Sequence, residues 1–155
     1  MKPQILSSPT FFDHRGSFAP INLNILDKNW IQSNISISDK INTFRGMHYQ
    51  RQPFSQAKLV KVIRGKIMDY IVDLRTESPD FMKLQEFELN EQNCLFVPRE
   101  FAHGFLTLED DTIVQYLVDN DYSKENEMTL FWNEIPELNL KLKKLNLILS
   151  EKDKP

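Results

Sequence analysis

The sequence of 155 residues has a single cysteine, Cys94, which excludes an intramolecular disulfide framework and a zinc site built from several thiolates. It has only four glycines, and it contains neither a G-x-G-x-x-G segment nor a P-loop, nor the G-x-S-x-G elbow of many hydrolases. No uninterrupted apolar run reaches the roughly 18 residues that a membrane span requires. We therefore expect a cytoplasmic protein with no membrane partner.

Basic residues are slightly fewer than acidic residues. The chain has 19 Lys and Arg residues and 22 Asp and Glu residues, which give a formal net charge of −3. Proteins that bind nucleic acid usually carry a basic excess, so we expect no nucleic-acid partner. A local cationic pocket for a small anion stays compatible with this balance. The 11 Phe residues favour an aromatic-rich core built on β-sheet.

The apolar residues fall mostly in short runs that turn residues separate, a pattern typical of strands. The pattern predicts strands at 58–63, 66–74, 83–89, 94–97, 101–108 and 112–118. Arg64-Gly65 is interpreted as the tight turn of a hairpin between the first two. Leucine recurs at every second position in 138–142 and again in 145–149, which predicts an extended segment over 136–150. The whole pattern predicts an all-β antiparallel fold, a double-sheet jelly roll or small barrel, as a single domain over residues 1–155.

Histidine is scarce, and of the three histidines only His103 lies in a predicted strand. His103 alternates with two phenylalanines, so it is equally compatible with a core histidine and a site residue. His48 is followed two positions later by Gln50, so the His-x-His pair of metal-binding barrels is missing. We therefore expect no metal site.

One predicted strand carries two lysines on opposite faces. Lys58 alternates with Val60, whereas Lys61 alternates with Leu59, so one ammonium must point inward or pass around the sheet edge. Tyr116 shares a strand face with apolar neighbours, for which a packed tyrosine with a bonded hydroxyl is the default interpretation. The residues alone leave these alternatives open.

Several segments follow one another in a recognisable order. They include DHRG at 13–16, RGMHYQ at 45–50, QAKLVKVIRG at 56–65, VDLRTESPDF at 72–81, PREFAHGFLTL at 98–108 and LSEKD at 149–153. In these segments the chain resembles the dTDP-4-dehydrorhamnose 3,5-epimerase family, over about residues 10–153. The resemblance implies a cupin-like jelly-roll barrel, a homodimer, a nucleotide-diphosphate sugar as substrate, and no cofactor.

The resemblance also implies roles for four catalytic residues. His48 corresponds to the base, and Asp153 corresponds to the carboxylate that orients it. Tyr116 corresponds to the acid that returns a proton from the opposite face, with Tyr122 as the alternative. Lys58 corresponds to the lysine near the developing enolate oxygen, where an ammonium in a dry cavity is most effective.

Five further positions match substrate-binding or active-site residues of the family: Arg15, Gln32, Asn34, Arg45 and His103. We expect Phe18 and Trp132 to border the nucleotide base. Arginine suits such a site because its planar guanidinium can bind phosphate oxygens in two places at once. Pro20 departs from the family pattern, which has a glutamate near this position. The identity of the nucleotide therefore stays open.

The expected activity is epimerisation at C3, C5 or both of a nucleotide-linked 4-keto-6-deoxyhexose, on a route to rhamnose or another deoxysugar of surface polysaccharide. Proton loss next to the ketone leaves an enolate, so the reaction needs a base, an acid on the opposite face and positive charge near the oxygen. A single-centre epimerase or a keto-isomerase on a related sugar is the enzymatic alternative. A sugar-nucleotide binding cupin without activity is the other, although binding alone needs no acid facing a base.

Overall fold

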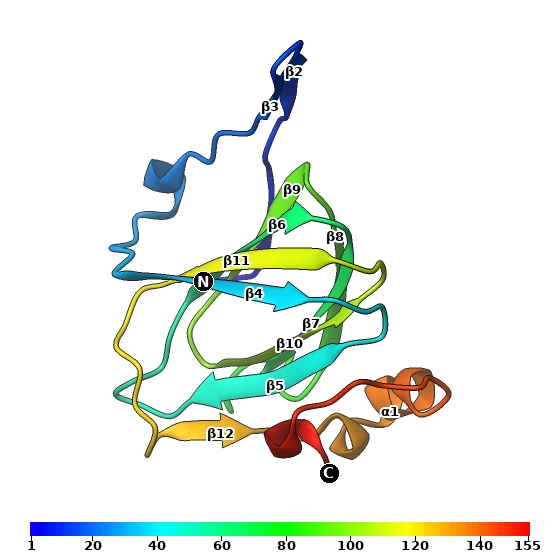
Figure 1. Ribbon diagram of the computed structural model, residues 1–155. Helices are drawn as coiled ribbons and strands as arrows, with labels where there is room; N and C mark the ends of the chain where they lie inside the picture. The colour runs from blue at the N-terminus through cyan, green and yellow to red at the C-terminus, as the bar shows by residue number, and fades with distance from the viewer.

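The computed structural model describes residues 1–155 except for the side chain of Ile25, and two antiparallel five-stranded sheets face each other in it (Figure 1). The first sheet contains, in spatial order, β1 (Gln4–Ser7), β9 (Asn93–Val97), β6 (Lys58–Arg64), β11 (Thr112–Val118) and β4 (Gln32–Ser38). The second contains β12 (Glu127–Thr129), β5 (Phe44–Gln50), β10 (Phe101–Thr107), β7 (Ile67–Asp73) and β8 (Leu84–Leu89). The predicted all-β double-sheet jelly roll is confirmed, and the ends of the six predicted strands agree within one residue.

The core lies between the sheets, because alternation along each strand sends every second side chain inward. Val60 and Val62 of β6 are fully buried there, together with Ile71 of β7 and Phe105 of β10. Burial of a large apolar side chain contributes roughly 1.5–3 kcal/mol to stability. Other inward positions carry polar side chains, and these form the site described below.

The predicted hairpin between β6 and β7 is wrong. β6 pairs with β9 and β11, whereas β7 pairs with β10 and β8 in the other sheet. The turn at Gly65 therefore carries the chain from one sheet to the other. Its φ is +83°, and a Cβ there would lie 2.6 Å from Thr112 Oγ1, so this turn requires glycine.

The extended structure predicted for 136–150 is wrong at its start, where the chain forms helix α1 (Pro136–Leu142). Leu138 and Leu142 lie four residues apart on one helix face and are fully buried against the outer face of the second sheet, whereas Leu140 is 59% exposed. The first residue is proline, whose missing N–H costs no hydrogen bond at a helix start. Leucines at every second position also satisfy the i, i+4 spacing of a helix. Packing against the sheet therefore decides between an extended segment and a helix.

Both lysines of β6 are withdrawn from solvent. Lys58 directs its ammonium into the barrel, which was one of the two alternatives. Lys61 faces outward but is only 4% exposed, because its Nζ donates a hydrogen bond to the carbonyl oxygen of Glu91 beside buried Leu59 and Cys94. Burial lowers the pKa of Lys61. The aliphatic stems of both side chains thus pack on the sheet.

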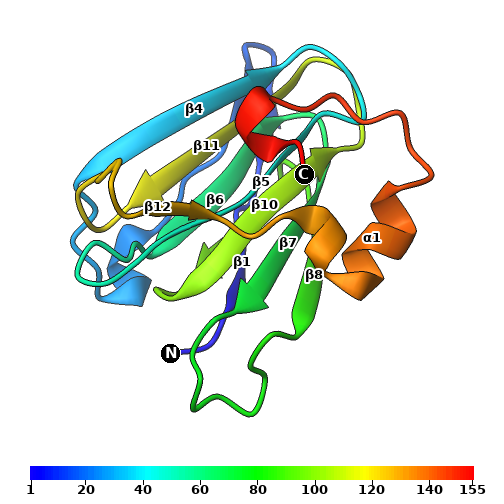
Figure 2. The same cartoon turned by 90° about the horizontal axis from the view of Figure 1, so that it is seen from below.

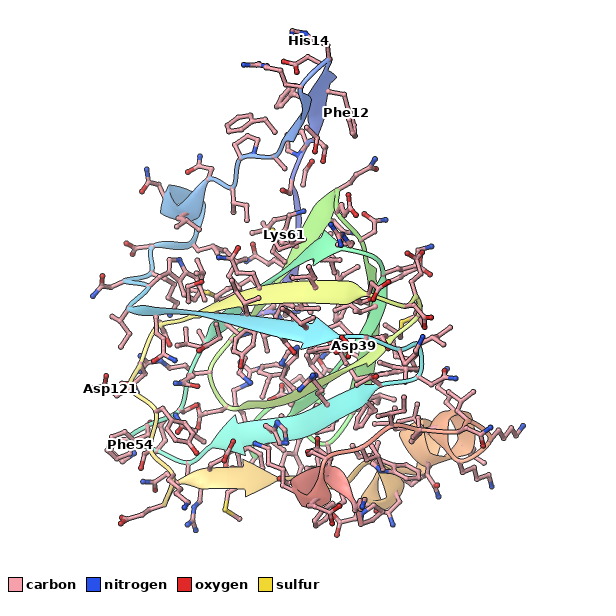
Figure 3. The ribbon with its side chains drawn as sticks, in the orientation of Figure 1. Phe12, His14, Asp39, Phe54, Lys61 and Asp121 are labelled. Atoms are coloured by element: carbon pink, nitrogen blue, oxygen red, sulfur yellow. The ribbon has the colours of Figure 1, made fainter. Side chains whose placement is uncertain are left out.

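An arm near the N-terminus projects away from the barrel (Figure 1). It is the two-stranded hairpin of β2 (Phe11–Asp13) and β3 (Gly16–Phe18), with His14 at its tip (Figure 3). Phe12 is 75% exposed and Phe18 is 68% exposed. The short helix η1 (Leu23–Leu26) follows the arm on the way to β4. Within the described residues, no helix is both long and apolar enough to cross a membrane.

Candidate active site

Inward-facing polar side chains surround two hollows between the sheets. Their volumes are about 170 Å³ and about 230 Å³, and we name them the Tyr122 hollow and the His103 hollow after one lining residue each. Four side chains line both hollows: His48, Lys58, Tyr116 and Lys152. The two hollows are therefore adjoining parts of one cavity, and both sheets contribute to its walls.

His48 of β5 is paired with a carboxylate from the far end of the chain. The last turn, η3 (Glu151–Asp153), lies against β5 (Figure 2), and His48 Nε2 is 2.6 Å from Asp153 Oδ1. Ser150 Oγ donates to Asp153 Oδ2 at 2.8 Å. Burial raises the pKa of Asp153, but the hydrogen bonds from His48 and Ser150 outweigh it and hold the pKa below its ordinary value. An anionic Asp153 keeps a proton on Nε2 and leaves Nδ1 of His48 to accept one.

A second histidine and carboxylate pair lies in the same sheet. His103 Nε2 of β10 is 2.8 Å from Asp69 Oδ2 of β7, and the two residues are 6% and 0% exposed. Burial lowers the pKa of His103 and raises the pKa of Asp69, while the interaction between the partners opposes both shifts. The imidazole of His103 is therefore neutral near pH 7, and with its Nε2–H held by Asp69 it presents its other nitrogen as an acceptor.

Two glycines allow the strands that carry these histidines to approach closely. Gly46 has a φ of +125°, and a Cβ there would collide with Gly104 and lie 2.7 Å from the carbonyl oxygen of His103. A Cβ on Gly104 would lie 2.7 Å from the carbonyl oxygen of Arg45. The register of β10 and β5 pairs His103 with His48 and shifts immediately afterwards. The glycines of RGMHYQ and FAHGF thus set the spacing of the two imidazoles.

The first sheet faces these histidines with Lys58 of β6 and Tyr116 of β11. Lys58 Nζ lies 3.5 Å from the carbonyl oxygen of His48. Burial lowers the pKa of Lys58 to about 8, although the negative charges of Asp69 and Glu127 oppose this shift. Burial raises the pKa of Tyr116, so its phenol is protonated at neutral pH. Because the sheets face each other, His48 and Tyr116 approach the cavity from opposite sides.

Three more of the predicted binding residues line the cavity. Gln32 and Asn34 of β4 line the Tyr122 hollow, and Gln32 Nε2 donates to Asn34 Oδ1 at 2.6 Å. Arg45 of β5 lines the His103 hollow and donates from Nη2 to the carbonyl oxygen of Ile37 at 2.9 Å and from Nε to Ser38 Oγ at 3.3 Å. These bonds hold the guanidinium at the wall, where its charge favours an anionic group.

The other three predicted binding residues lie elsewhere in the single chain. Arg15 and Phe18 belong to the arm, line a separate hollow within it and are exposed. Trp132 begins η2 (Trp132–Glu134) and packs with Leu138 and other residues that cover the outer face of the second sheet. In the single chain the Trp132 ring joins this apolar cover and does not line either hollow.

The sequence interpretation missed Asp69, Glu127 and Lys152. The signal for Asp69 is a carboxylate at an inward position of a buried strand, which needs a partner. Lys152 directly precedes Asp153, and its Nζ donates to Glu127 Oε1 at 2.9 Å. Tyr122 Oη donates to Glu127 Oε2 at 3.1 Å. The Glu127 carboxylate thus links Lys152 and Tyr122 at the wall of the Tyr122 hollow.

The two histidines of the cavity each engage one carboxylate and not a larger set. His48 and His103 each contact one aspartate through Nε2. Gln50, at the second position of the missing His-x-His pair, bonds to backbone groups of nearby loops. Within the part of the chain that the structure describes, no group of three or more His, Cys, Asp or Glu side chains is arranged to hold a metal ion.

A sequence profile described as dTDP-4-dehydrorhamnose 3,5-epimerase matches residues 4–155. The chain belongs to this family. A relative called dTDP-4-dehydrorhamnose 3,5-epimerase in Sinorhizobium fredii is 40% identical over an alignment of 152 positions that covers 92% of this chain and 77% of the relative. The family resemblance that the short motifs suggested is thereby confirmed.

Two solved structures extend the family assignment to the fold. The dTDP-4-dehydrorhamnose 3,5-epimerase of Bacillus anthracis, with TDP and PPi bound, has a TM-score of 0.89 and 38% identity, covering 97% of this chain and 90% of its own. The dTDP-6-deoxy-D-glucose-3,5-epimerase of Legionella pneumophila, in complex with dTDP-4-keto-L-rhamnose, has a TM-score of 0.83 and 27% identity, covering 97% of this chain and 84% of its own. The fold is therefore the cupin jelly roll of these epimerases.

Proposed function

We propose that the chain is an epimerase that inverts C3, C5 or both of a nucleotide-linked 4-keto-6-deoxyhexose. The observation that carries the proposal is the approach of an oriented imidazole, His48, and a protonated phenol, Tyr116, to one cavity from opposite sheets. Family membership supports the same reaction. The proposed setting is the cytoplasm, in synthesis of a deoxysugar such as rhamnose for surface polysaccharide.

The proposed mechanism is proton transfer through an enolate. His48 takes a proton from the carbon next to the C4 ketone, and Asp153 stabilises the imidazolium that forms. The Lys58 ammonium stabilises the negative charge on the C4 oxygen, in a cavity where little water competes. Tyr116 then donates its proton to the opposite face of the carbon, which inverts the centre. Exchange with water restores the proton of the phenol and removes that of the imidazole.

The Tyr122 hollow is proposed to hold the part of the substrate that does not react. Its wall combines the amides Gln32 and Asn34 with the charged pair of Glu127 and Lys152, which suits sugar hydroxyls and phosphate oxygens. The relatives from B. anthracis and L. pneumophila contain TDP and a dTDP sugar, so a dTDP sugar is the substrate to test first. Pro20, where the family pattern has a glutamate, makes other nucleotides worth including.

The proposal includes a homodimer in which the arm of one chain completes the cavity of the other. Arg15 matches a binding residue of the family and Phe18 is expected to border the base, yet both are exposed on an arm that projects from its own barrel. The edge strand β4 also exposes Ile35 and Ile37, at 66% and 61%. Exposed apolar side chains on an edge strand are typical of a surface that a partner covers. Closed two-fold dimers are the commonest assemblies.

Solvent exchange tests the proposed function directly. The protein is incubated with a dTDP-4-keto-6-deoxyhexose in heavy water, and proton NMR follows the hydrogens on C3 and C5. We expect exchange at both carbons for a double epimerase and at one carbon for the single-centre alternative. Binding without exchange at either carbon would reject catalysis and leave the non-catalytic binding cupin.

A further inference from the structure

Gln50 ends β5, two residues after His48, and its side chain joins two loops. The residue is 7% exposed. Its Nε2 donates to the carbonyl oxygens of Phe54 at 2.7 Å and Asp121 at 3.0 Å, and its Oε1 accepts from the backbone N–H of Ser123 at 2.6 Å. The Gln50 side chain therefore makes three hydrogen bonds to backbone groups, and these groups belong to two segments that lie far apart in the sequence.

The two loops, 51–57 and 119–123, follow the ends of β5 and β11 on one side of the barrel, where Figure 3 labels Phe54 and Asp121. Asn120 adds two bonds between the loops, from Nδ2 to carbonyl oxygens of the first loop at 2.9 Å and 3.2 Å. Side-chain amides thus hold these loops together beyond the ends of the strands. Gln50 is the amide that also fixes the loops to the strand of the catalytic base.

The same loops form one wall of the Tyr122 hollow. Ser55 and Gln56 of the first loop and Tyr122 of the second line it, together with Gln50 itself. Tyr122 is held in turn by Glu127 of β12. The amide of Gln50 therefore determines how far this wall stands from the imidazole two residues before it on β5.

We propose that Gln50 is a positioning residue that keeps the nucleotide-binding wall of the cavity in register with the catalytic base. The assignment rests on the proposed function, because that function gives the wall its ligand. The chemistry of the side chain is specific. A carboxylate at this position would face two carbonyl oxygens, and an alkyl group would leave three buried backbone groups without partners.

Gln50→Leu and Gln50→Glu test the assignment. Since the wall binds the part of the substrate that does not react, we expect KM for the dTDP-4-keto sugar to rise about tenfold while kcat changes less than about threefold. Without substrate, amide hydrogen exchange in 119–123, measured by mass spectrometry, should accelerate by about tenfold. Gln85→Leu is the matched control, since it changes a half-buried glutamine on β8. It should alter neither KM nor exchange.

Unchanged KM together with unchanged exchange in Gln50→Leu would overturn the assignment, and so would an effect confined to kcat. If Gln50→Leu does not fold, Gln50→Glu and Asn120→Ala replace it. The alanine variant removes the two additional bonds between the loops and the bond from the Asp121 N–H to Asn120 Oδ1, but it leaves the bonds of Gln50 in place. A smaller acceleration in the same segment is therefore expected, and full protection in both variants would overturn the assignment. Absence of turnover by the unaltered protein would reject the proposed function instead, and hydrogen exchange would still decide the role of Gln50.

Discussion

Lys58 carries a charge into the barrel, where burial lowers its pKa to about 8. The ammonium form is present below this pH and is lost above it, so the charge that we propose stabilises the enolate oxygen disappears as the pH rises through about 8. We expect kcat/KM for exchange at C3 or C5 to fall about tenfold per pH unit above this value. Lys58→Arg keeps its charge at every accessible pH, and any activity it retains should lack this fall. A rate of the unaltered protein that stays constant to about pH 10 would contradict the role of Lys58.

At the scale of residues, the resemblance to the family predicted the pairing of His48 with Asp153, which lie 105 positions apart in the sequence. Local patterns contain no information about such a pair, because the contact depends on η3 lying across β5. The inward position of Asp69 in a buried strand signalled that it needs a partner, but the identity of that partner could not be predicted for the same reason. Its partner His103 lies on a neighbouring strand, and the order of strands in a sheet cannot be obtained from periodicity.

At the scale of elements, the contact of β5 with β10 depends on glycine at two positions. Gly46→Ala would combine a left-handed φ with a collision against Gly104, so we expect the free energy of unfolding to fall by about 2–4 kcal/mol. Gly16→Ala is the matched control, because Gly16 has a similar φ of +129° but nothing within 4 Å of a new Cβ. Its loss should be about 1–2 kcal/mol, from backbone strain alone. Equal losses in denaturant unfolding would show that the close packing contributes nothing.

The positions of six strands, β6 to β11, were predictable because their short apolar runs end at turn residues. β4 and β5 were not predicted, because their polar residues interrupt any such run. The partners of β6 and β7 were not predictable, since a tight turn at Gly65 is equally compatible with a hairpin and with a crossing between sheets. Helix α1 was misread because Leu138 and Leu142 satisfy both the strand and the helix period. Burial of that one face against the second sheet selects the helix.

At the scale of the whole molecule, the proposed dimer places the arm of one chain at the cavity of its partner. We therefore expect His48→Ala and Arg15→Ala to be weakly active alone and to regain activity when they are mixed and allowed to exchange subunits. Random mixing gives one complete cavity in each mixed dimer, so about a quarter of the cavities should be complete. Turnover of the dTDP-4-keto sugar measures the recovery.

Mixing His48→Ala with Asp153→Asn provides the control for subunit exchange. Both changes affect the same pair within one barrel, so a mixed dimer contains no intact pair and should regain nothing. Recovery in this control would show that the gain has another origin. Sedimentation of the unaltered protein as a monomer, or no recovery with Arg15→Ala, would contradict the shared cavity.

The proposed reaction depends on His48 as the base that removes the proton and on Tyr116 as the acid that returns one on the opposite face. The most direct test compares His48→Ala and Tyr116→Phe in heavy water, with proton NMR following both exchange and inversion at C3 and C5. We predict no exchange with His48→Ala, and exchange without inversion with Tyr116→Phe, because the base is then intact while the opposing acid is missing. Exchange at the unaltered rate in His48→Ala, or normal inversion in Tyr116→Phe, would contradict the account.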